Sequence, residues 1–300
     1  MTAEAEKVES PTELRNPDTV DIDTVPTVDV LRRINAEDGR VAGAVDTVLP
    51  AIARAVDTAV EALQAGGRIH YFGAGTSGRI GVMDAAELPP TYGVDPDLVV
   101  AHQAGGAAAR DQAMEDVEDS EEGGAAEATD VGRGDVAVGL TASGRTPYVV
   151  GALRAARAAG AVTVLVSSNP EAAFGSEVDV HVGVDTGPEA IAGSTRMKAG
   201  TAQKLVLNAF STAVMVRLGR TYSNLMIGML AKNAKLRGRT VTVLMEASGR
   251  DAEVCEETLE DAGGDARIAL VALLSGVPVD RAEAAIASSA GSVREALRLL

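Results

Sequence analysis

Short runs of consecutive apolar residues alternate with longer segments of helical periodicity through the middle of the chain. Near-continuous runs rich in Val, Ile and Leu, separated by helical segments, are typical of a parallel sheet that is buried on both faces. The sequence therefore predicts an α/β fold, a three-layer αβα sandwich with a mostly parallel sheet. The predicted strands are 68–72, 98–101, 135–140, 161–166 and 178–184, and the helices are 78–87 (ended by Pro89 and Pro90), 107–121, 147–158 and 194–218.

The two ends of the chain differ from this alternating region. A polar stretch to about residue 20 predicts an extended arm, followed by a helix near 27–35 and helical spacing over 42–63 that is broken near Pro50. Beyond residue 239 only helical patterns occur. We expect an N-terminal arm with helices over 1–58, the α/β domain over 59–222 and a helical C-terminal domain over 240–300, with C-terminal helices at 252–262, 265–274, 281–287 and 293–299.

Composition narrows the classes of function. The chain has 43 acidic and 27 basic residues, a formal net charge of -16, which argues against a nucleic-acid binder that relies on clustered Lys and Arg. One cysteine excludes an intramolecular disulfide and a cysteine-based zinc cluster. The polar N-terminus is unlike a signal peptide, and no apolar run is long enough to span a membrane, so we expect a cytoplasmic protein.

The first predicted strand leads into a glycine-rich loop, Gly73-Ala74-Gly75-Thr76-Ser77-Gly78. The pattern fits a dinucleotide-binding loop, but the next strand ends in 101–103 without the acidic residue that would bind the ribose. Hydroxyls of Thr76 and Ser77 at a helix N-terminus favour a terminal phosphate monoester. A purely structural turn is the third interpretation.

A second hydroxyl-rich loop, 141–147, follows the third predicted strand. It carries Thr141, Ser143 and Thr146 just before Pro147, a suitable first residue of a helix. Ligands of open α/β sheets bind at the carboxyl ends of the strands, so two such loops predict a phosphate site there. The alternative is that both loops only cap their helices.

The two loops resemble the phosphosugar-binding loops of the SIS (sugar isomerase) domain. Several further blocks, in the same order, resemble the N-acetylmuramic acid 6-phosphate etherase family over essentially the whole chain. These blocks are 12–16 (TELRN), 21–23, 34–38, 73–79, 84–91, 142–148, 187–189 and 193–204 (GSTRMKAGTAQK). The resemblance identifies the α/β domain as a phosphosugar-binding SIS domain.

The resemblance implies a carbon–oxygen lyase that removes the D-lactyl group of N-acetylmuramic acid 6-phosphate and releases N-acetylglucosamine 6-phosphate. In the family's route the sugar opens to its aldehyde, a base removes the C2 proton, lactate leaves C3 and water adds. The resemblance further implies that no metal and no organic cofactor are needed.

By motif match the two catalytic carboxylates fall on Glu87, within 86–90, and on Glu118, within 115–119. Proton abstraction beside a carbonyl and protonation of a leaving alkoxide call for one basic and one acidic group. Read without the resemblance, Glu87 is a surface residue at a helix end and Glu118 belongs to a solvated charge run. Further candidates for substrate binding, which could instead pair with acidic residues or stabilise the fold, are Arg79, Glu189, Ser194, Arg196, Lys198 and Lys204.

Helix geometry adds a constraint on Glu87. Between Gly78 and Glu87 a helix rises about 14 Å, which is long for a sugar whose phosphate lies at Ser77. We therefore expect that Glu87 and the phosphate loops of one site need not belong to the same chain, and that the site is built across the interface of a homodimer.

Two other functions remain open. A glucokinase regulatory protein resembles the same family, so the chain could be a non-catalytic sugar-phosphate sensor. A sugar-phosphate isomerase would share the loops but not the block 193–204.

The chain departs from the family pattern at three positions. Leu88 stands where the family has Cys after the first glutamate, Asp116 stands in place of a glycine, and Gly228 stands in place of an acidic residue.

Overall fold

The computed structural model describes residues 10–112, 114, 116–228 and 234–300. The first nine residues of the expected arm and Glu115 of the acidic motif lie outside the described residues. The chain forms two compact units. The first comprises the residues up to Ala85 with Asp97–Ser211, and the second comprises Ala86–Pro96 with Thr212–Leu300. None of the described helices has the length and apolar character needed to cross a membrane.

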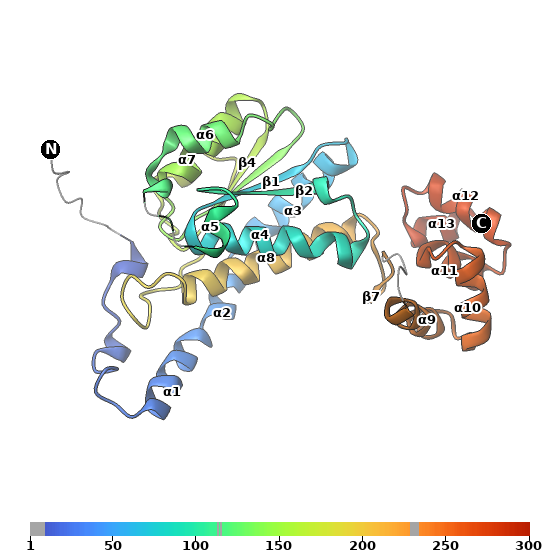
Figure 1. The fold of residues 1–300 in the computed structure, drawn as a ribbon, viewed down its shortest axis with the longest axis horizontal. Helices are drawn as coiled ribbons and strands as arrows, with labels where there is room; N and C mark the ends of the chain where they lie inside the picture. Colours follow the sequence, from blue (N-terminus) through green and yellow to red (C-terminus); the bar gives the residue numbers. More distant parts are fainter. Residues whose placement is uncertain (1–9, 113, 115, 229–233) are drawn as a thin grey trace. The chain divides into compact units, whose positions relative to one another are not determined.

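A five-stranded parallel sheet forms the centre of the first unit (Figure 1). The strand order is β2-β1-β3-β4-β5, and the order reverses between β1 and β3. The expected parallel sheet is confirmed, because continuous apolar runs bury both faces of these strands. The strands are β1 Ile69–Gly73, β2 Val99–Gln103, β3 Val136–Leu140, β4 Val162–Ser167 and β5 Val180–Gly183.

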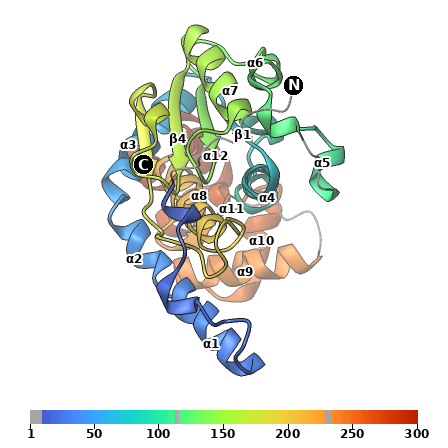
Figure 2. The same ribbon diagram turned by 90° about the vertical axis from the view of Figure 1, so that its left-hand side faces the viewer.

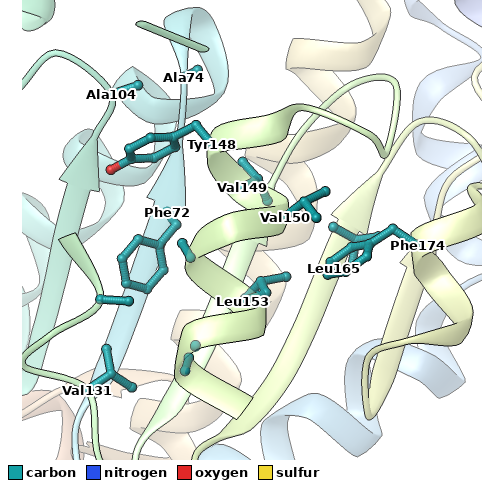
Figure 3. Packing of buried hydrophobic residues seen from close by; sticks show 14 of the residues in the cluster. Phe72, Ala74, Ala104, Val131, Tyr148, Val149, Val150, Leu153, Leu165 and Phe174 are labelled. Carbon is teal, nitrogen blue, oxygen red and sulfur yellow. The ribbon is translucent and has the colours of Figure 1, made fainter. Parts of the chain in front are cut away.

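Helices cover both faces of the sheet, so the αβα sandwich is confirmed. On one face, α7 (Pro147–Ala158) places Val149 and Leu153 against Phe72 and Leu165 of the strands (Figure 3), and α6 (Glu121–Glu127) packs on α7. On the other face, α3 (Leu49–Gln64) and α8 (Lys198–Arg217) meet the valines of β3, β4 and β5 through side chains that include Ile52, Leu207 and Phe210.

Two predicted helices differ from the observed ones. The helix predicted over 107–121 is wrong: α5 (Ala108–Asp111) is short, and η4 (Val117–Asp119) follows Asp116, whose φ of 65° is left-handed. Ser120 then begins α6, because its hydroxyl accepts the N–H of Gly123 at 2.9 Å. The helix predicted to stop before Pro89 instead continues as α4 (Gly75–Tyr92). The two prolines lie in its last turns, and the N–H of Gly93 still bonds to the carbonyl of Pro89.

The N-terminal segment is less extended than predicted. The arm contains two short 3-10 helices, η1 (Pro11–Glu13) and η2 (Pro17–Thr19). It continues into α1 (Thr27–Asp38) and α2 (Val41–Asp46), and α1 extends away from the sheet in both views (Figures 1 and 2). Pro50 occupies the first turn of α3, where a missing N–H costs little, so the break near Pro50 is confirmed.

The second unit is mainly helical. Its four C-terminal helices match the predicted segments, and Cys255 is buried in their core. A small antiparallel hairpin and α9 were not predicted. The elements are β6 Thr221–Tyr222, β7 Leu225–Met226, α9 Ala234–Ser248, α10 Ala252–Asp261, α11 Ala266–Ser275, α12 Val279–Ser288 and α13 Val293–Leu299, and the remaining 3-10 helices of the chain are η3 Pro96–Leu98 and η5 Ala173–Ser176.

Candidate active site

A cavity of about 530 Å³ opens in the first unit at the carboxyl ends of β1 and β3. The sheet order reverses between these two strands, and ligands of such sheets bind at that point. The lining residues come from both glycine-rich loops, from η4, from the N-terminal arm and from the segment before α8. They are Glu13, Ala74, Gly75, Thr76, Ser77, Glu118, Asp119, Leu140, Ala142, Ser143, Arg145, Thr146, Pro147 and Thr195.

The first loop presents a helix N-terminus to the cavity. Because α4 begins at Gly75, Thr76 and Ser77 lie in its first turn, where backbone N–H groups have no partner within the helix. The strand and the helix approach each other closely: a Cβ on Gly78 would lie 2.6 Å from the carbonyl oxygen of Gly73. Two hydroxyls, free N–H groups and the helix dipole together suit a phosphate.

The second loop adds hydroxyls from the neighbouring strand. Ser143 and Thr146 line the cavity, whereas Thr141 is buried and is not among the described residues that line it. The Oγ1 atoms of Thr141 and Thr146 are 2.7 Å apart, and the hydroxyl of Thr141 also accepts the N–H of Gly144 at 3.2 Å. Thr141 therefore orients the loop, and four of the five predicted phosphate-binding hydroxyls face one cavity.

Glu118 reaches the same cavity from η4, beside Asp119. The side chain of Arg79 holds the segment that precedes η4, since its guanidinium donates to the carbonyls of Ala109 at 3.0 Å and Gln112 at 2.9 Å. Arg79 thus contributes to the placement of this segment, and it does not line the cavity among the described residues.

Glu87 lies near the C-terminal end of α4. Its side chain is exposed and is not among the described residues that line the cavity. Ten residues separate Ser77 from Glu87, a rise of about 15 Å along the helix.

Two of the other candidates stabilise the start of α8. The carboxylate of Glu189 is fully buried and accepts the backbone N–H groups of Lys198 at 2.8 Å and Ala199 at 2.9 Å. Burial raises the pKa of Glu189 despite these bonds. The ammonium of Lys198 forms a buried ion pair with Glu37. Ser194, Arg196 and Lys204 are half-buried or exposed and, among the described residues, none of the three lines this cavity.

Sequence reasoning missed four lining residues with functional side chains: Glu13, Asp119, Arg145 and Thr195. Each of the four lies within one of the sequence motifs 12–16, 115–119, 142–148 and 193–204. Membership of these motifs, and not the residue type, was therefore the signal that could have found them. The cavity therefore combines side-chain hydroxyls with three carboxylates and one guanidinium. Within the described ranges, no group of three or more His, Cys, Asp or Glu side chains is arranged to hold a metal ion.

The fold and the cavity define a SIS-type domain. Residues 51–157 match the family model of the glucokinase regulatory protein N-terminal SIS domain. A phosphoheptose isomerase from Francisella tularensis shares the fold with a TM-score of 0.53 at 16% identity, covering 64% of this chain and 100% of that chain.

Relatives that match along most of the chain identify the family more specifically than the fold does. An N-acetylmuramic acid 6-phosphate etherase of Thermobifida fusca is 64% identical over 91% of this chain and 90% of the relative. An etherase of the same name from Symbiobacterium thermophilum is 54% identical over 89% of this chain and 89% of the relative. Another from Cutibacterium acnes is 51% identical over 95% of this chain and 95% of the relative. The chain belongs to the N-acetylmuramic acid 6-phosphate etherase family.

Proposed function

We propose that this protein is an enzyme, a carbon–oxygen lyase that cleaves the D-lactyl ether of N-acetylmuramic acid 6-phosphate and yields N-acetylglucosamine 6-phosphate and D-lactate. The observation that carries the proposal is the 64% identity to an etherase over 91% of the chain. The cavity at the strand ends supports it, because its hydroxyls and helix N-terminus suit a sugar phosphate.

In the proposed reaction, Thr76, Ser77, Ser143 and Thr146 hold the phosphate and so fix the opened sugar. A base removes the proton from C2, the electron pair forms the C2–C3 double bond, and the C3–O bond breaks. The departing lactate oxygen takes a proton. Water then adds its oxygen to C3 and a proton returns to C2, so that atoms and charges balance.

Glu118 and Glu87 are the proposed proton-transfer groups. The position of Glu118 in the cavity lining supports this role. General acid–base catalysis requires each group within hydrogen-bond reach of its proton, and the rise along α4 makes this difficult for Glu87 of the same chain. We propose a homodimer in which Glu87 of each protomer serves the cavity of its partner.

Exposed apolar side chains support self-association. Val28 and Leu31 on the projecting α1 are 50% and 60% exposed, and Met83, one turn before Glu87 on α4, is 42% exposed. Burying such side chains against a second copy of the chain removes apolar surface from water, which favours association. On α4, Met83 and Glu87 lie on one face, because residues four apart are neighbours on a helix.

Mixed dimers test the shared site. Glu87→Gln and Glu118→Gln variants, each expected to lose about 100-fold or more of the activity alone, are dissociated, mixed and reassociated. If each cavity uses its partner's glutamate, half of the sites in mixed dimers are intact and the mixture regains about a quarter of the wild-type rate. No regain, with mixed dimers demonstrated by mass spectrometry, would contradict the shared site.

The function itself is tested by D-lactate release from N-acetylmuramic acid 6-phosphate, measured with a coupled D-lactate dehydrogenase. Stoichiometric lactate and N-acetylglucosamine 6-phosphate are expected. Binding of the sugar phosphate without lactate release would favour a sensor. We also propose a cytoplasmic location, because a phosphorylated substrate does not cross membranes unaided.

A further inference from the structure

The cavity contains a carboxylate that the proposed reaction does not use. Glu13 lies in η1, in the N-terminal arm, yet it lines the same cavity as Ser77, Ser143 and Glu118. More than sixty residues separate it from the nearest of these along the chain, so its place in the cavity depends on how the arm is attached.

Hydrogen bonds fasten the arm to the segment 187–195 before α8. The carbonyl of Thr12 accepts the N–H of Gly193 at 3.2 Å, and the hydroxyl of Thr19 donates to the carbonyl of Ala190 at 2.8 Å. Between them, the amide of Asn16 donates to the carbonyl of Pro188 at 3.2 Å and to the carboxylate of Glu37 at 2.8 Å. Thr12, Asn16 and Thr19 are buried, whereas Glu13, between two of them, is exposed.

A glycine leaves room for the Glu13 carboxylate. A Cβ on Gly193 would lie 3.2 Å from Oε2 of Glu13, and the φ of Gly193 is +74°, in the left-handed region. Both the close approach and the backbone conformation favour glycine at this position. The segment before α8 is thus shaped to accept the carboxylate as well as the arm.

The chemistry of the cavity limits what Glu13 can bind. An ionised carboxylate only accepts hydrogen bonds, so it does not bind a phosphate or the lactyl carboxylate. From a sugar phosphate it can accept hydrogen bonds only from the neutral donors, the hydroxyls and the acetamido N–H. Hydrogen bonds to charged groups contribute more than neutral ones, so such a contact discriminates between a sugar phosphate and a bare phosphate.

We propose that Glu13 is a substrate-binding residue that selects for the sugar portion of the ligand by accepting a hydrogen bond from a hydroxyl or the acetamido N–H. The proposal rests on the proposed function in taking the ligand to be an amino-sugar 6-phosphate. The hydrogen bonds that Thr12, Asn16 and Thr19 form with the segment 187–195 position Glu13 in the cavity.

Calorimetric titration of the full-length protein separates the two parts of the ligand. The titrants are N-acetylglucosamine 6-phosphate and inorganic phosphate. In Glu13→Gln the affinity for the sugar phosphate falls about tenfold, while that for inorganic phosphate stays the same or rises. Retained phosphate binding also shows that the variant is folded. Glu171→Gln, an exposed carboxylate that does not line the cavity, is the matched control and leaves both affinities unchanged.

A second variant and a second sugar phosphate test the role of Glu13 further. Gly193→Ala, which crowds the Glu13 carboxylate, reproduces the selective loss with Glu13 intact. Glucose 6-phosphate carries a hydroxyl in place of the acetamido group: a loss for both sugars in Glu13→Gln assigns the donor as a hydroxyl, and a loss for the acetamido sugar alone assigns it as the N–H.

The outcomes distinguish this proposal from the proposed function. Equal changes in sugar-phosphate and phosphate affinity in Glu13→Gln, or none, overturn the role of Glu13 even if the wild type releases lactate. A selective loss without any lactate release supports Glu13 and refutes the etherase. Failure of the wild type to bind N-acetylglucosamine 6-phosphate overturns both.

Discussion

Glu37 and Lys198, 161 residues apart in the sequence, form a buried ion pair with 2.5 Å between Oε2 and Nζ. The pair joins α1 to the first turn of α8, next to the Glu189 carboxylate that accepts the N–H of Lys198. Asn16 of the arm also bonds to Glu37. One cluster therefore connects the arm, α1 and the segment that lines the cavity.

Removing one member of this pair should be costly. In Glu37→Gln the ammonium of Lys198 stays buried without its carboxylate, and we expect a loss of about 3 kcal/mol in the stability of the first unit, because an uncompensated buried charge is strongly unfavourable. Thermal unfolding monitored by circular dichroism measures the loss.

The double variant Glu37→Gln/Lys198→Met is the control. It removes both charges and should recover most of the unfolding midpoint. A double variant no more stable than Glu37→Gln would contradict a dominant role for the ion pair.

Glu118→Gln should reduce kcat by about 100-fold or more, the contribution typical of a general acid or base. The Kd for inorganic phosphate should not rise, because the phosphate hydroxyls are untouched. Steady-state lactate release and phosphate titration measure the two. Glu122→Gln, an exposed carboxylate on α6 outside the cavity lining, serves as the control. Full activity in Glu118→Gln would exclude Glu118 from proton transfer.

Ser77→Ala should raise KM about tenfold or more, because a hydrogen bond to a charged group contributes about 1.5–3 kcal/mol. Inorganic phosphate should inhibit the wild type competitively and the variant more weakly. Ser176→Ala, whose exposed hydroxyl bonds to the carbonyl of Ala173, should leave both constants unchanged. An unchanged KM in Ser77→Ala would place the phosphate elsewhere.

The buried imidazole of His70 makes the stability of the fold sensitive to acid. Burial, with His102 and Arg68 nearby, lowers the pKa of His70 from 6.5 to about 4. In the unfolded chain the imidazole takes up its proton near pH 6.5, so the stability it contributes is present above that pH and is lost as the pH falls toward 4.

Replacement of His70 should therefore flatten the pH dependence of stability over that window. In His70→Gln the thermal midpoint should fall less between pH 6.5 and 4 than in the wild type, whatever its value at neutral pH. An NMR titration of the His70 ring should give a midpoint near 4. An unchanged slope, or a ring that titrates near 6.5, would contradict the assignment.

Local sequence patterns account for the sheet and for the phosphate loops. Apolar runs specify the buried strands directly, and a hydroxyl-rich loop between a strand and a helix carries its chemistry with it. The predicted helix over 107–121 was wrong because Ala and Glu favour a helix, whereas the left-handed Asp116 and the Ser120 cap divide the segment.

The rest of the cavity depends on contacts that no local pattern shows. Glu13 reaches it because Asn16 and Thr19 bond to carbonyls 172 and 171 residues away. Lys198, a candidate ligand from its motif, is paired instead with a glutamate from α1. Both follow from tertiary hydrogen bonding, and residue type alone could not distinguish a ligand from a buried partner.

The fate of the oxygen at C3 tests the central claim most directly. The protein is incubated with N-acetylmuramic acid 6-phosphate in 18O-water and the products are examined by mass spectrometry and NMR. Elimination and hydration predict one 18O at C3 of N-acetylglucosamine 6-phosphate and unlabelled D-lactate. Label in the lactate with none at C3, or no lactate at all, would contradict the account.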